Sequence, residues 1–497
     1  MDWLAEIVKN LNTLNNLPAF YIRDEYYSYQ QTKTKILSIA QEINSIENIQ
    51  NIGIVTGDDF ETYSTLLACL LLQKTYVPLN RKNPVQRNIN IVSEGKINLV
   101  ICSDELMRTE LINSHQNINV INPLLLKGKL VDLDISYPEF NPNALAYILF
   151  TSGSTGKPKG VPITYSNMSA FINKVLSDPL FEYSKTDRFL QMFELSFDPS
   201  VFSTITPLYF GACCYVVPDS GMIFHHVFNM FEDHAITVAL LTPSVINYLR
   251  VYFKEINLPH LKYSMFCGEA LHDSVARQWQ NCIPNATIHN WYGPTEGTVI
   301  CLQFNQQKNS DIPANDLMPI GKPLPGIQVI LVDEEGQLID EVNFTGELCI
   351  YGDQVINEYW NNPDANLKSF YFHKKLKKLF YKTGDLCEID VSGNYHYIGR
   401  KDFQVKINGY RMELAEIEFF ARKFENVSQA IVMKKNDQEL VLFIEPLNVS
   451  FIQDNLIENL KENLPWYMIP KNIIMVNEMP LNQNMKIDRI KLSALIS

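Results

Sequence analysis

Cysteine and histidine patterns that hold metals or disulfides are missing from this sequence. Its nine cysteines include no Cys-x-x-Cys pair, and no histidine follows them at the spacing of a zinc site. Their number is odd, and most lie in apolar surroundings, as Cys69 and Cys349 do, where a free cysteine behaves as a small buried hydrophobe. These absences argue against a zinc-binding or disulfide-stabilised domain and favour a reducing compartment.

Targeting and membrane signals are also missing. Residues 1–6 contain neither a basic region nor a long apolar one, and no uninterrupted apolar run reaches 18 residues. We therefore expect a soluble, cytoplasmic protein without an integral membrane segment. With 42 basic and 55 acidic residues, the net charge of −13 argues against a nucleic-acid or anionic-membrane partner. The basic run at 373–378 predicts a solvated hairpin tip, and a surface that steers an acidic partner is the alternative.

Internal repeats and low-complexity tracts are absent too, so the fold must come from ordinary domains. A length of 497 residues, 46% of them hydrophobic, allows two to four domains. Strand-like and helix-like segments alternate from 52 to 102 and again from 189 to 291, which predicts α/β subdomains with parallel sheets covered by helices. Residues 19–29 are predicted to form one further strand.

Two regions depart from this alternation. From about 319 to 400 the helical segments thin out and glycines recur, which predicts a small β-rich subdomain. Residues 402–497 have helical and strand-like segments with an apolar core of their own, which predicts a small α+β domain. The predicted fold class is therefore α/β. A large N-terminal domain, 1–400, combines α/β subdomains with the β-rich subdomain, and a small mobile α+β domain follows at 402–497.

A loop suited to an anion follows a predicted strand at 145–150. Residues 151–160 consist only of Thr, Ser, Gly, Lys and Pro, so that glycines admit a close ligand while hydroxyls, amides and two lysines can bind phosphate. The loop is not a P-loop, because Thr151 stands where the Walker pattern needs its first glycine and Pro158 where it needs Ser or Thr. A polyphosphate is the expected ligand, and a flexible linker is the alternative.

Five motifs, in this order and spacing, resemble those of the adenylate-forming enzymes. They are the loop at 151–160, Tyr-Gly-Pro-Thr-Glu at 292–296, Tyr-Lys-Thr-Gly-Asp at 381–385, Gly-Arg-Lys-Asp at 399–402 and Asn-Met-Lys-Ile-Asp-Arg at 484–489. Further stretches at 266–269, 402–414 and 464–470 are similar to the D-alanine:D-alanyl carrier protein ligases, which are stand-alone relatives of the amino-acid adenylation domains of nonribosomal peptide synthetases. The resemblance covers nearly the whole chain.

This resemblance implies an AMP-forming ligase that uses ATP and Mg²⁺. Lys486 matches the lysine that bridges the substrate carboxylate and the α-phosphate, two negative groups that must be neutralised together. Asp385 matches the carboxylate that holds the ribose, with Arg400 nearby, and Glu296 matches the magnesium ligand. The other implied ATP-binding residues are Thr151, Ser152, Gly153, Ser154, Thr155, Gly156, Lys159, Gly268, Glu269, Ala270, Tyr292 (whose ring packs on adenine), Gly293 and Thr295.

The resemblance also implies two positions of the small domain. Asp402 falls at the hinge between the domains, where a short polar junction between two cores suits a hinge on physical grounds as well. The small domain is expected to close with Lys486 over the adenylation site and then to turn Arg411 toward it for thioester formation, so Arg411 is a second expected catalytic residue. Met485 departs from the family pattern, since relatives usually have Gly before the lysine.

One buried carboxylate indicates the class of substrate. Asp198 lies in an apolar segment, where a carboxylate needs a partner, and it matches the aspartate that binds the α-ammonium group in amino-acid-activating relatives. The alternative is an aspartate that caps its own turn before Pro199. Trp291 stands where the D-alanine ligases have a small hydroxyl residue, so only a small side chain is expected to fit. By resemblance the pocket comprises Asp198, Pro199, Phe202, Leu240, Met265, Cys267, Trp291, Val299 and Ile300, with Cys267 a wall rather than a nucleophile.

These features predict that the protein activates a small amino acid, with D-alanine the leading substrate, as the aminoacyl-AMP. The expected acceptor is the phosphopantetheine thiol of a separate carrier protein, with free coenzyme A as the alternative, because no Leu-Gly-Gly-x-Ser carrier segment follows Lys486. Three alternatives stay open: activation of another small amino acid for a natural product, an acyl- or aryl-CoA ligase, and a silent protein that binds ATP or an acyl-adenylate. The pair His225-His226 lacks the Asp-Gly of a condensation domain and is predicted to lie in a helix. We expect a monomer.

Overall fold

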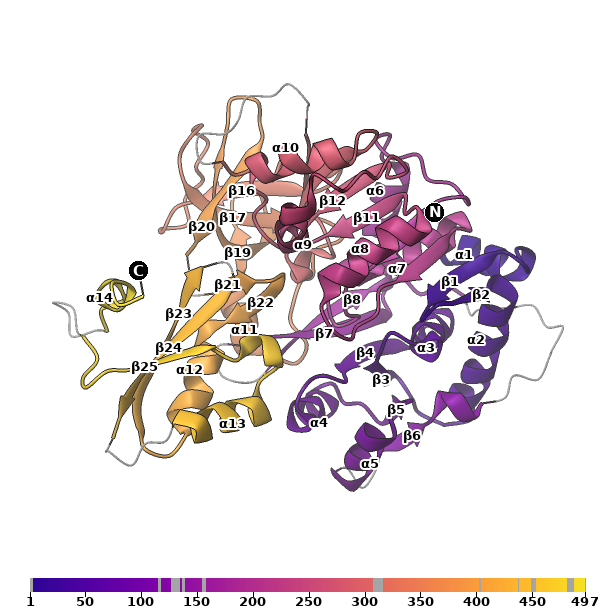
Figure 1. Cartoon of the computed structure of the whole chain (residues 1–497), viewed down its shortest axis with the longest axis horizontal. Helices are drawn as coiled ribbons and strands as arrows, with labels where there is room; N and C mark the ends of the chain where they lie inside the picture. Colours follow the sequence, from indigo (N-terminus) through magenta and orange to yellow (C-terminus); the bar gives the residue numbers. More distant parts are fainter. Residues whose placement is uncertain are drawn as a thin grey trace. The chain divides into compact units, whose positions relative to one another are not determined.

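The computed structural model gives two compact units, and each is described by itself. The first comprises Met1–Asn80, Val92–Leu149 and Gly160–Lys401, and the second comprises Arg81–Ile91, Phe150–Lys159 and Asp402–Ser497. Figure 1 labels the helices and strands of both. Among the described residues, no helix combines the length and the apolar character needed to cross a bilayer. The structure describes residues 3–114, 118–126, 135, 139–153, 158–306, 316–401, 404–436, 438–447, 453–480 and 487–496.

The largest sheet of the first unit has nine strands, most of them parallel. The strands are β1 (Pro18–Ile22), β2 (Glu25–Ser28), β9 (Arg188–Gln191), β10 (Cys213–Val216), β11 (Val238–Leu241), β12 (Tyr263–Phe266), β13 (Thr287–Tyr292), β14 (Leu302–Asn305) and β15 (Lys322–Pro323). Their order is β15-β14-β13-β12-β11-β9-β10-β1-β2, with parallel neighbours from β13 to β1. Because parallel strands end at the same edge of a sheet, the loops after β9, β11, β12 and β13 share that edge.

One prediction for this sheet is wrong. Residues 19–29 form the antiparallel hairpin of β1 and β2 rather than a single strand. The chain reverses at Arg23 and Asp24, which both adopt left-handed backbone conformations with φ of 50° and 64°. Asp tolerates this conformation better than most residues do, and an Arg-Asp pair carries no strong turn signal of its own.

A second, six-stranded sheet contains the strand that leads into the predicted phosphate loop. Its strands are β3 (Asn51–Thr56), β4 (Thr75–Asn80), β5 (Leu99–Ile101), β6 (Asn119–Ile121), β7 (Leu145–Thr151) and β8 (Lys159–Thr164), in the order β6-β5-β3-β4-β7-β8. The pairs from β6 to β7 are parallel, and β7 confirms the strand predicted at 145–150. The helices of the first unit are α1 (Trp3–Thr13), α2 (Tyr29–Asn44), α3 (Phe60–Leu71), α5 (Glu105–Ser114), α6 (Tyr165–Ser177), α7 (Pro199–Phe210), α8 (Ile223–His234), α9 (Pro243–Leu249) and α10 (Asp273–Cys282); α4 (Val85–Glu94) is divided between the two units.

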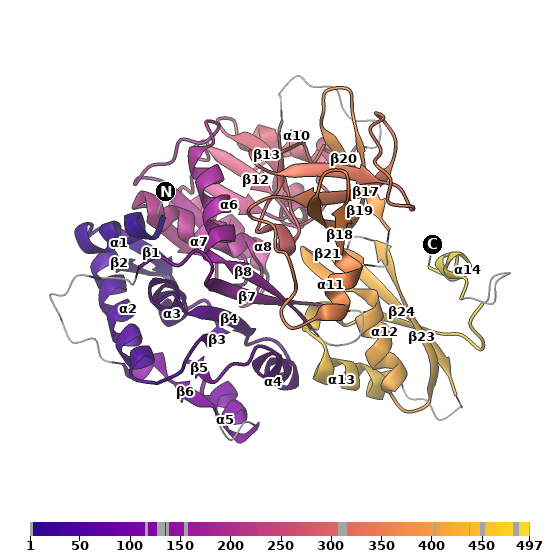
Figure 2. The same ribbon diagram turned by 180° about the vertical axis from the view of Figure 1, so that it is seen from behind.

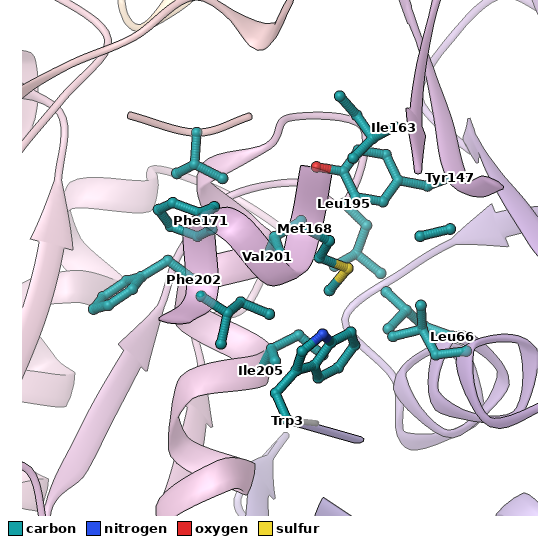
Figure 3. Close-up of a cluster of buried hydrophobic side chains, with 14 of the residues drawn as sticks. Trp3, Leu66, Tyr147, Ile163, Met168, Phe171, Leu195, Val201, Phe202 and Ile205 are labelled. Carbon is teal, nitrogen blue, oxygen red and sulfur yellow. The ribbon is translucent and has the colours of Figure 1, made fainter. Parts of the chain in front are cut away.

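Helix α7 fixes the position of Asp198, the residue that precedes it. The helix begins at Pro199, whose restricted φ and missing N–H suit a first turn, and ends before Gly211, whose φ of 72° closes it. The pair His225-His226 lies in α8, as predicted. The buried face of α7 lies in the hydrophobic cluster of Figure 3, among the labelled side chains Trp3, Met168, Phe171, Val201, Phe202 and Ile205.

An antiparallel sheet completes the first unit. Its strands are β16 (Gln328–Val332), β17 (Gly346–Tyr351), β18 (Phe370–His373), β19 (Lys378–Ile389) and β20 (Tyr395–Arg400). Their order is β16-β17-β19-β18, with β20 paired to β19, and α11 (Pro363–Ser369) lies beside β18 and β19 (Figure 2). The basic run at 373–378 turns the chain between β18 and β19, as predicted.

The second unit has a hydrophobic core of its own. Helices α12 and α13 lie on one side of the sheet β23-β24-β25 (Figure 1) and bury Ile417, Leu456 and Leu460 against it. Segments 81–91 and 150–159 belong to this unit, so the loop after β7 is grouped with the C-terminal part of the chain. The elements are β21 (Gln404–Ile407), β22 (Tyr410–Glu413), α12 (Leu414–Lys423), β23 (Val427–Asn436), β24 (Glu439–Pro446), α13 (Gln453–Asn463), β25 (Asn472–Met475) and α14 (Arg489–Ser493).

Candidate active site

Polar residues follow the parallel strands at one edge of the nine-stranded sheet. Glu269, three residues after β12, accepts a hydrogen bond of 2.9 Å from the amide of Ser244, in the first turn of α9 after β11. Gly268 has a left-handed φ of 89°, a conformation that glycine adopts without strain, and the exposed Ala270 follows. The loop after β12, which the sequence predicts to bind ATP, is therefore linked to the start of α9 at this edge.

Asp385 is held by side chains from two other segments. Its carboxylate is nearly buried and accepts hydrogen bonds from the Tyr292 hydroxyl and, at 2.8 Å, from Arg400 Nη1. The same guanidinium nitrogen also donates to the Thr383 carbonyl at 2.7 Å. Burial, with the carboxylate beside it, raises the pKa of the Tyr292 phenol well above its usual value, so this hydroxyl is a fixed donor at neutral pH.

A bulge in β19 places Asp385. On β17, Cys349 pairs with Lys382 and Glu347 pairs with Leu386. The three residues between Lys382 and Leu386 therefore oppose only Leu348. Gly384 lies within this bulge with a left-handed φ of 72°. Thr383 fastens the bulge by donating to the Leu348 carbonyl and accepting from the Asp385 amide. Gly384 thus lies in a bulge of the ladder between β17 and β19, while the adjacent Asp385 stays paired with Arg400 of β20.

Glu296 is fully buried in a short helical turn after β13, the 3-10 helix Thr295–Gly297. The Tyr359 hydroxyl donates to its carboxylate at 2.7 Å and lies 3.2 Å from the Tyr381 hydroxyl. Within the described ranges, no group of three or more His, Cys, Asp or Glu side chains could hold a metal by itself. A single carboxylate nevertheless fits Mg²⁺, which takes one or two protein carboxylates and completes its shell with phosphate and water oxygens.

Asp198 is buried and is held by backbone rather than by its own helix. Its carboxylate makes no cap hydrogen bond to α7, which removes the alternative of a self-capping aspartate. Instead Asp198 Oδ2 accepts a hydrogen bond of 2.9 Å from the Val299 amide. Val299 and the preceding Thr298 both have left-handed backbone conformations, with φ of 69° and 57°, which are uncommon for β-branched residues.

Most of the other predicted pocket residues belong to the main hydrophobic core of the first unit. The rings of Phe202 and Trp291 meet edge to face with centroids 5.0 Å apart. Trp291 Nε1 is buried and has no hydrogen-bond partner in the part of the chain that the structure describes. Pro199, the first residue of α7, is partly buried. The buried members of one hydrophobic cluster include Phe202, Leu240, Met265, Cys267, Trp291, Val299 and Ile300.

Two polar residues of this region, one buried and one partly buried, follow no recognised motif. Gln354 is fully buried, and its amide donates to the Gly297 carbonyl at 2.7 Å and to the Ile300 carbonyl. Lys174 Nζ donates to the Gln354 side-chain oxygen at 2.9 Å. Gly293, in the predicted ATP-binding set, lies so close to this segment that an added Cβ would stand 2.6 Å from the Val299 carbonyl oxygen. The sequence offers no signal for Gln354 or Lys174, because Gln354 acts on main-chain carbonyls far away in the chain and Lys174 acts on the Gln354 side chain.

The second unit holds the described part of the phosphate loop and Arg411. Ser152 Oγ accepts from the Glu413 amide at 3.1 Å, and the Gly153 amide donates to Glu416 at 3.3 Å. Glu416 is buried and forms an ion pair of 2.7 Å with Arg87. The side-chain nitrogen Nε of Arg411 donates to Gln404.

The two loop residues at the ends of β7 and β8 lie in the same unit. Thr151 Oγ1 donates to the Lys159 carbonyl at 3.4 Å, and Lys159 Nζ lies 3.9 Å from the Glu413 carboxylate. The predicted residues Ser154, Thr155, Gly156, Asp402 and Lys486 lie outside the described residues, as does Met485. The roles of all these residues stay predictions.

Known proteins are similar in sequence to this chain over almost its whole length. Residues 8–360 match the family model described as AMP-binding enzyme. The D-alanine--D-alanyl carrier protein ligase of Lactococcus lactis is 30% identical over 486 residues, which cover 94% of this chain and 93% of that protein. Malpinin synthetase of Mortierella alpina is 30% identical over 96% of this chain, but the chain spans only 6% of that protein.

A solved structure extends the likeness to three dimensions. The Vibrio cholerae adenylation domain AlmE, in complex with glycyl-adenosine-5'-phosphate, has a TM-score of 0.88 and 25% identity, with 100% of this chain and 98% of that chain covered. The predicted α/β fold class is confirmed by this likeness.

Proposed function

Because the chain belongs to the family of AMP-binding enzymes, as its motifs predict, we propose that it is an AMP-forming ligase that activates a small amino acid. D-alanine is the leading substrate. The acceptor is the phosphopantetheine thiol of a separate carrier protein; a carrier protein is named in the description of the Lactococcus lactis relative. The protein is proposed to work in the cytoplasm as a monomer.

The observation that supports an amino acid is the environment of Asp198. This carboxylate is buried beside an apolar cluster and is oriented by the Val299 amide. An α-ammonium group is the cation that such a carboxylate would bind, whereas an acyl or aryl acid would leave its negative charge uncompensated at the substrate. The walls formed by Phe202 and Trp291 leave the role of recognition to this one charged group.

The reaction follows from the proposed roles. A substrate carboxylate oxygen attacks the α-phosphorus of ATP and pyrophosphate leaves; the carrier thiol sulfur then attacks the carbonyl carbon and AMP leaves. Asp385, oriented by Arg400 and Tyr292, binds the ribose hydroxyls, and Lys486 neutralises the reacting anions. When bound, Mg²⁺ supplies positive charge against the phosphate oxygens, and Glu296 is the side chain that would hold it.

Glycine is the second candidate substrate, and Trp291 favours it. The indole is 2% exposed and lies against Phe202, in the position where the D-alanine ligases have a small hydroxyl residue. A wall this large selects against even one added methyl group by about 1 to 3 kcal/mol. AlmE, which shares the fold over the full chain, was solved with a glycyl adenylate.

ATP–pyrophosphate exchange tests the proposal directly. Glycine, D-alanine, L-alanine, propanoate and benzoate would be compared with the natural chain and with Asp198→Ala. We expect exchange with glycine or D-alanine that the substitution abolishes, followed by a mass increase on a holo-carrier protein. The absence of exchange with every small amino acid would contradict the proposal. Exchange with propanoate or benzoate that survives Asp198→Ala, and acyl transfer to coenzyme A, would instead indicate an acyl- or aryl-CoA ligase.

A further inference from the structure

The segment 297–301 is held in a conformation that its own residues disfavour. Thr298 and Val299 are consecutive left-handed residues, and both are β-branched and buried. A β-branched side chain crowds the backbone in this conformation, so the surrounding structure must hold it there. The segment matters for the site because the Val299 amide is the donor to Asp198.

Gln354 fastens this segment from both sides of the strained pair. Its side-chain amide donates to the carbonyls of Gly297 and Ile300, the residues that flank Thr298 and Val299. The main-chain carbonyl of Gln354 accepts a further hydrogen bond of 2.6 Å from the Thr298 hydroxyl. Gln354 is fully buried, so these bonds are shielded from competition with water.

Lys174 sets the orientation of the Gln354 amide. Its ammonium group donates to Gln354 Oε1 at 2.9 Å, and an ammonium group can only donate. The oxygen must therefore face Lys174, and the NH₂ group must face the carbonyls of the segment. Burial lowers the pKa of Lys174, as expected for an ammonium group that has lost part of its hydration. Helix α6, which contains Lys174, and the loop after β17 thus meet at one glutamine.

We propose that Gln354, oriented by Lys174, is a positioning residue for the amino-acid site. It keeps the Val299 amide pointed at Asp198 and so holds the carboxylate in the orientation that an α-ammonium group needs. This inference rests on the proposed function, because it assigns Gln354 a part in amino-acid binding and none in ATP binding. The nucleotide groups Asp385 and Arg400 are held by bonds of their own.

Gln354→Met tests the inference, because methionine has a similar volume but cannot donate. The KM for the amino acid should rise about tenfold, while the KM for ATP stays within about twofold. Lys174→Met should shift the amino-acid KM in the same direction by about threefold, since it leaves the amide in place but free to turn. Gln280→Met is the matched control: Gln280 also donates to two backbone carbonyls, those of Ile283 and Ala286, but these lie at the end of α10.

A double-variant cycle separates positioning from simple stability. In an Asp198→Asn background, Gln354→Met should have no further effect on the preference for alanine over propanoate, because the carboxylate it orients is gone. Equal changes in both KM values, or an unchanged amino-acid KM in a folded variant, would overturn the inference. If Gln354→Met does not fold, Lys174→Met decides by the same two KM values.

The substrates activated by the natural chain test the proposed function, and the KM values of the variants test the role of Gln354. If it activates no amino acid but does activate another carboxylate, the proposed function fails. The positioning role of Gln354 is then judged by whether Gln354→Met changes the KM for that carboxylate and leaves the KM for ATP unchanged. If Gln354→Met loses both adenylate formation and transfer to the acceptor while its unfolding midpoint is unchanged, the result would count against a positioning role for Gln354.

Discussion

Asp385 and Asp198 are both buried carboxylates of the first unit, and they are held in opposite ways. Asp385 accepts from two side chains, the Tyr292 hydroxyl and the Arg400 guanidinium, and both donors lie on strands. Asp198 accepts from a backbone amide in a left-handed segment that is held by a distant glutamine. The proposed nucleotide side therefore depends on local pairing, while the proposed amino-acid side depends on the conformation of a loop.

This difference teaches where each side can change. A side-chain donor on a strand keeps its direction through the ladder of its neighbours, as Arg400 does opposite Asp385 in the pairing of β19 with β20. An amide in the segment 297–301 can be redirected by any change at Gln354 or Gly293. Selectivity for the amino acid could thus be adjusted without disturbing ATP binding.

The largest expected effect comes from exchanging the two carboxylates for amides. On the proposed roles, Asp198→Asn removes the charge that binds the ammonium group and should lower kcat/KM for the amino acid by about 10² to 10³-fold, roughly 3 to 4 kcal/mol. Asp385→Asn should raise the KM for ATP instead and leave the preference among amino acids unchanged. Pyrophosphate exchange at varied ATP and varied amino acid gives both values. Identical kinetic changes in the two variants would break the comparison.

A smaller effect is expected on stability when the pH is lowered. This loss of stability should not distinguish Asp198 from Asp385. His289 precedes Trp291 and Tyr292 on β13; burial lowers its pKa from 6.5 to about 4, while nearby Asp178 acts weakly in the opposite direction. Between these values the unfolded chain binds the proton and the folded chain does not. Stability should therefore be complete above pH 6.5 and fall by about 3 kcal/mol as the pH is lowered to 4.

Urea unfolding at pH 7 and at pH 5 measures this dependence. In the His289→Gln variant the difference between the two pH values should shrink, because the titrating group is gone, while acid-sensitive carboxylates elsewhere still contribute. If the natural chain and the variant lose the same free energy between pH 7 and pH 5, His289 does not govern the acid response.

The next effect concerns the close approach of backbone at Gly293. A Cβ added there would stand 2.6 Å from Ile300 Cα and from the Val299 carbonyl oxygen, and both are backbone atoms that cannot swing aside. Gly293→Ala should lower the free energy of unfolding by about 2 kcal/mol and raise the KM for the amino acid more than the KM for ATP. Gly399→Ala is a suitable control, because an added Cβ there meets no atom within 4 Å. Equal stability of the two variants would show that the segment yields easily.

The two sides also differ in how far the sequence predicts them. Asp385 and Arg400 are marked by recognisable motifs, and the apolar run at 145–150 predicts β7. Gln354 was missed, because its partners are main-chain carbonyls that carry no residue identity. The hairpin at 19–29 and the conformation of Val299 were missed for a related reason. Each needs left-handed backbone at a residue whose side chain disfavours it, Arg23 in the hairpin and Val299 in the loop, so tertiary packing decides against local preference.

The smallest effect should come from Tyr292→Phe, at the residue that directly precedes Gly293. Phenylalanine keeps the ring that is proposed to pack on adenine and removes only the hydroxyl that donates to Asp385. Arg400 still holds the carboxylate, so the loss should be about 1.5 kcal/mol, or roughly tenfold in the KM for ATP. The KM for the amino acid should not change, because the substitution leaves the Val299 amide and the hydrogen bonds of Gln354 in place. Adjacent substitutions at 292 and 293 would then act on different substrates, and a shift of both KM values in either variant would show that the two carboxylates are coupled through β13.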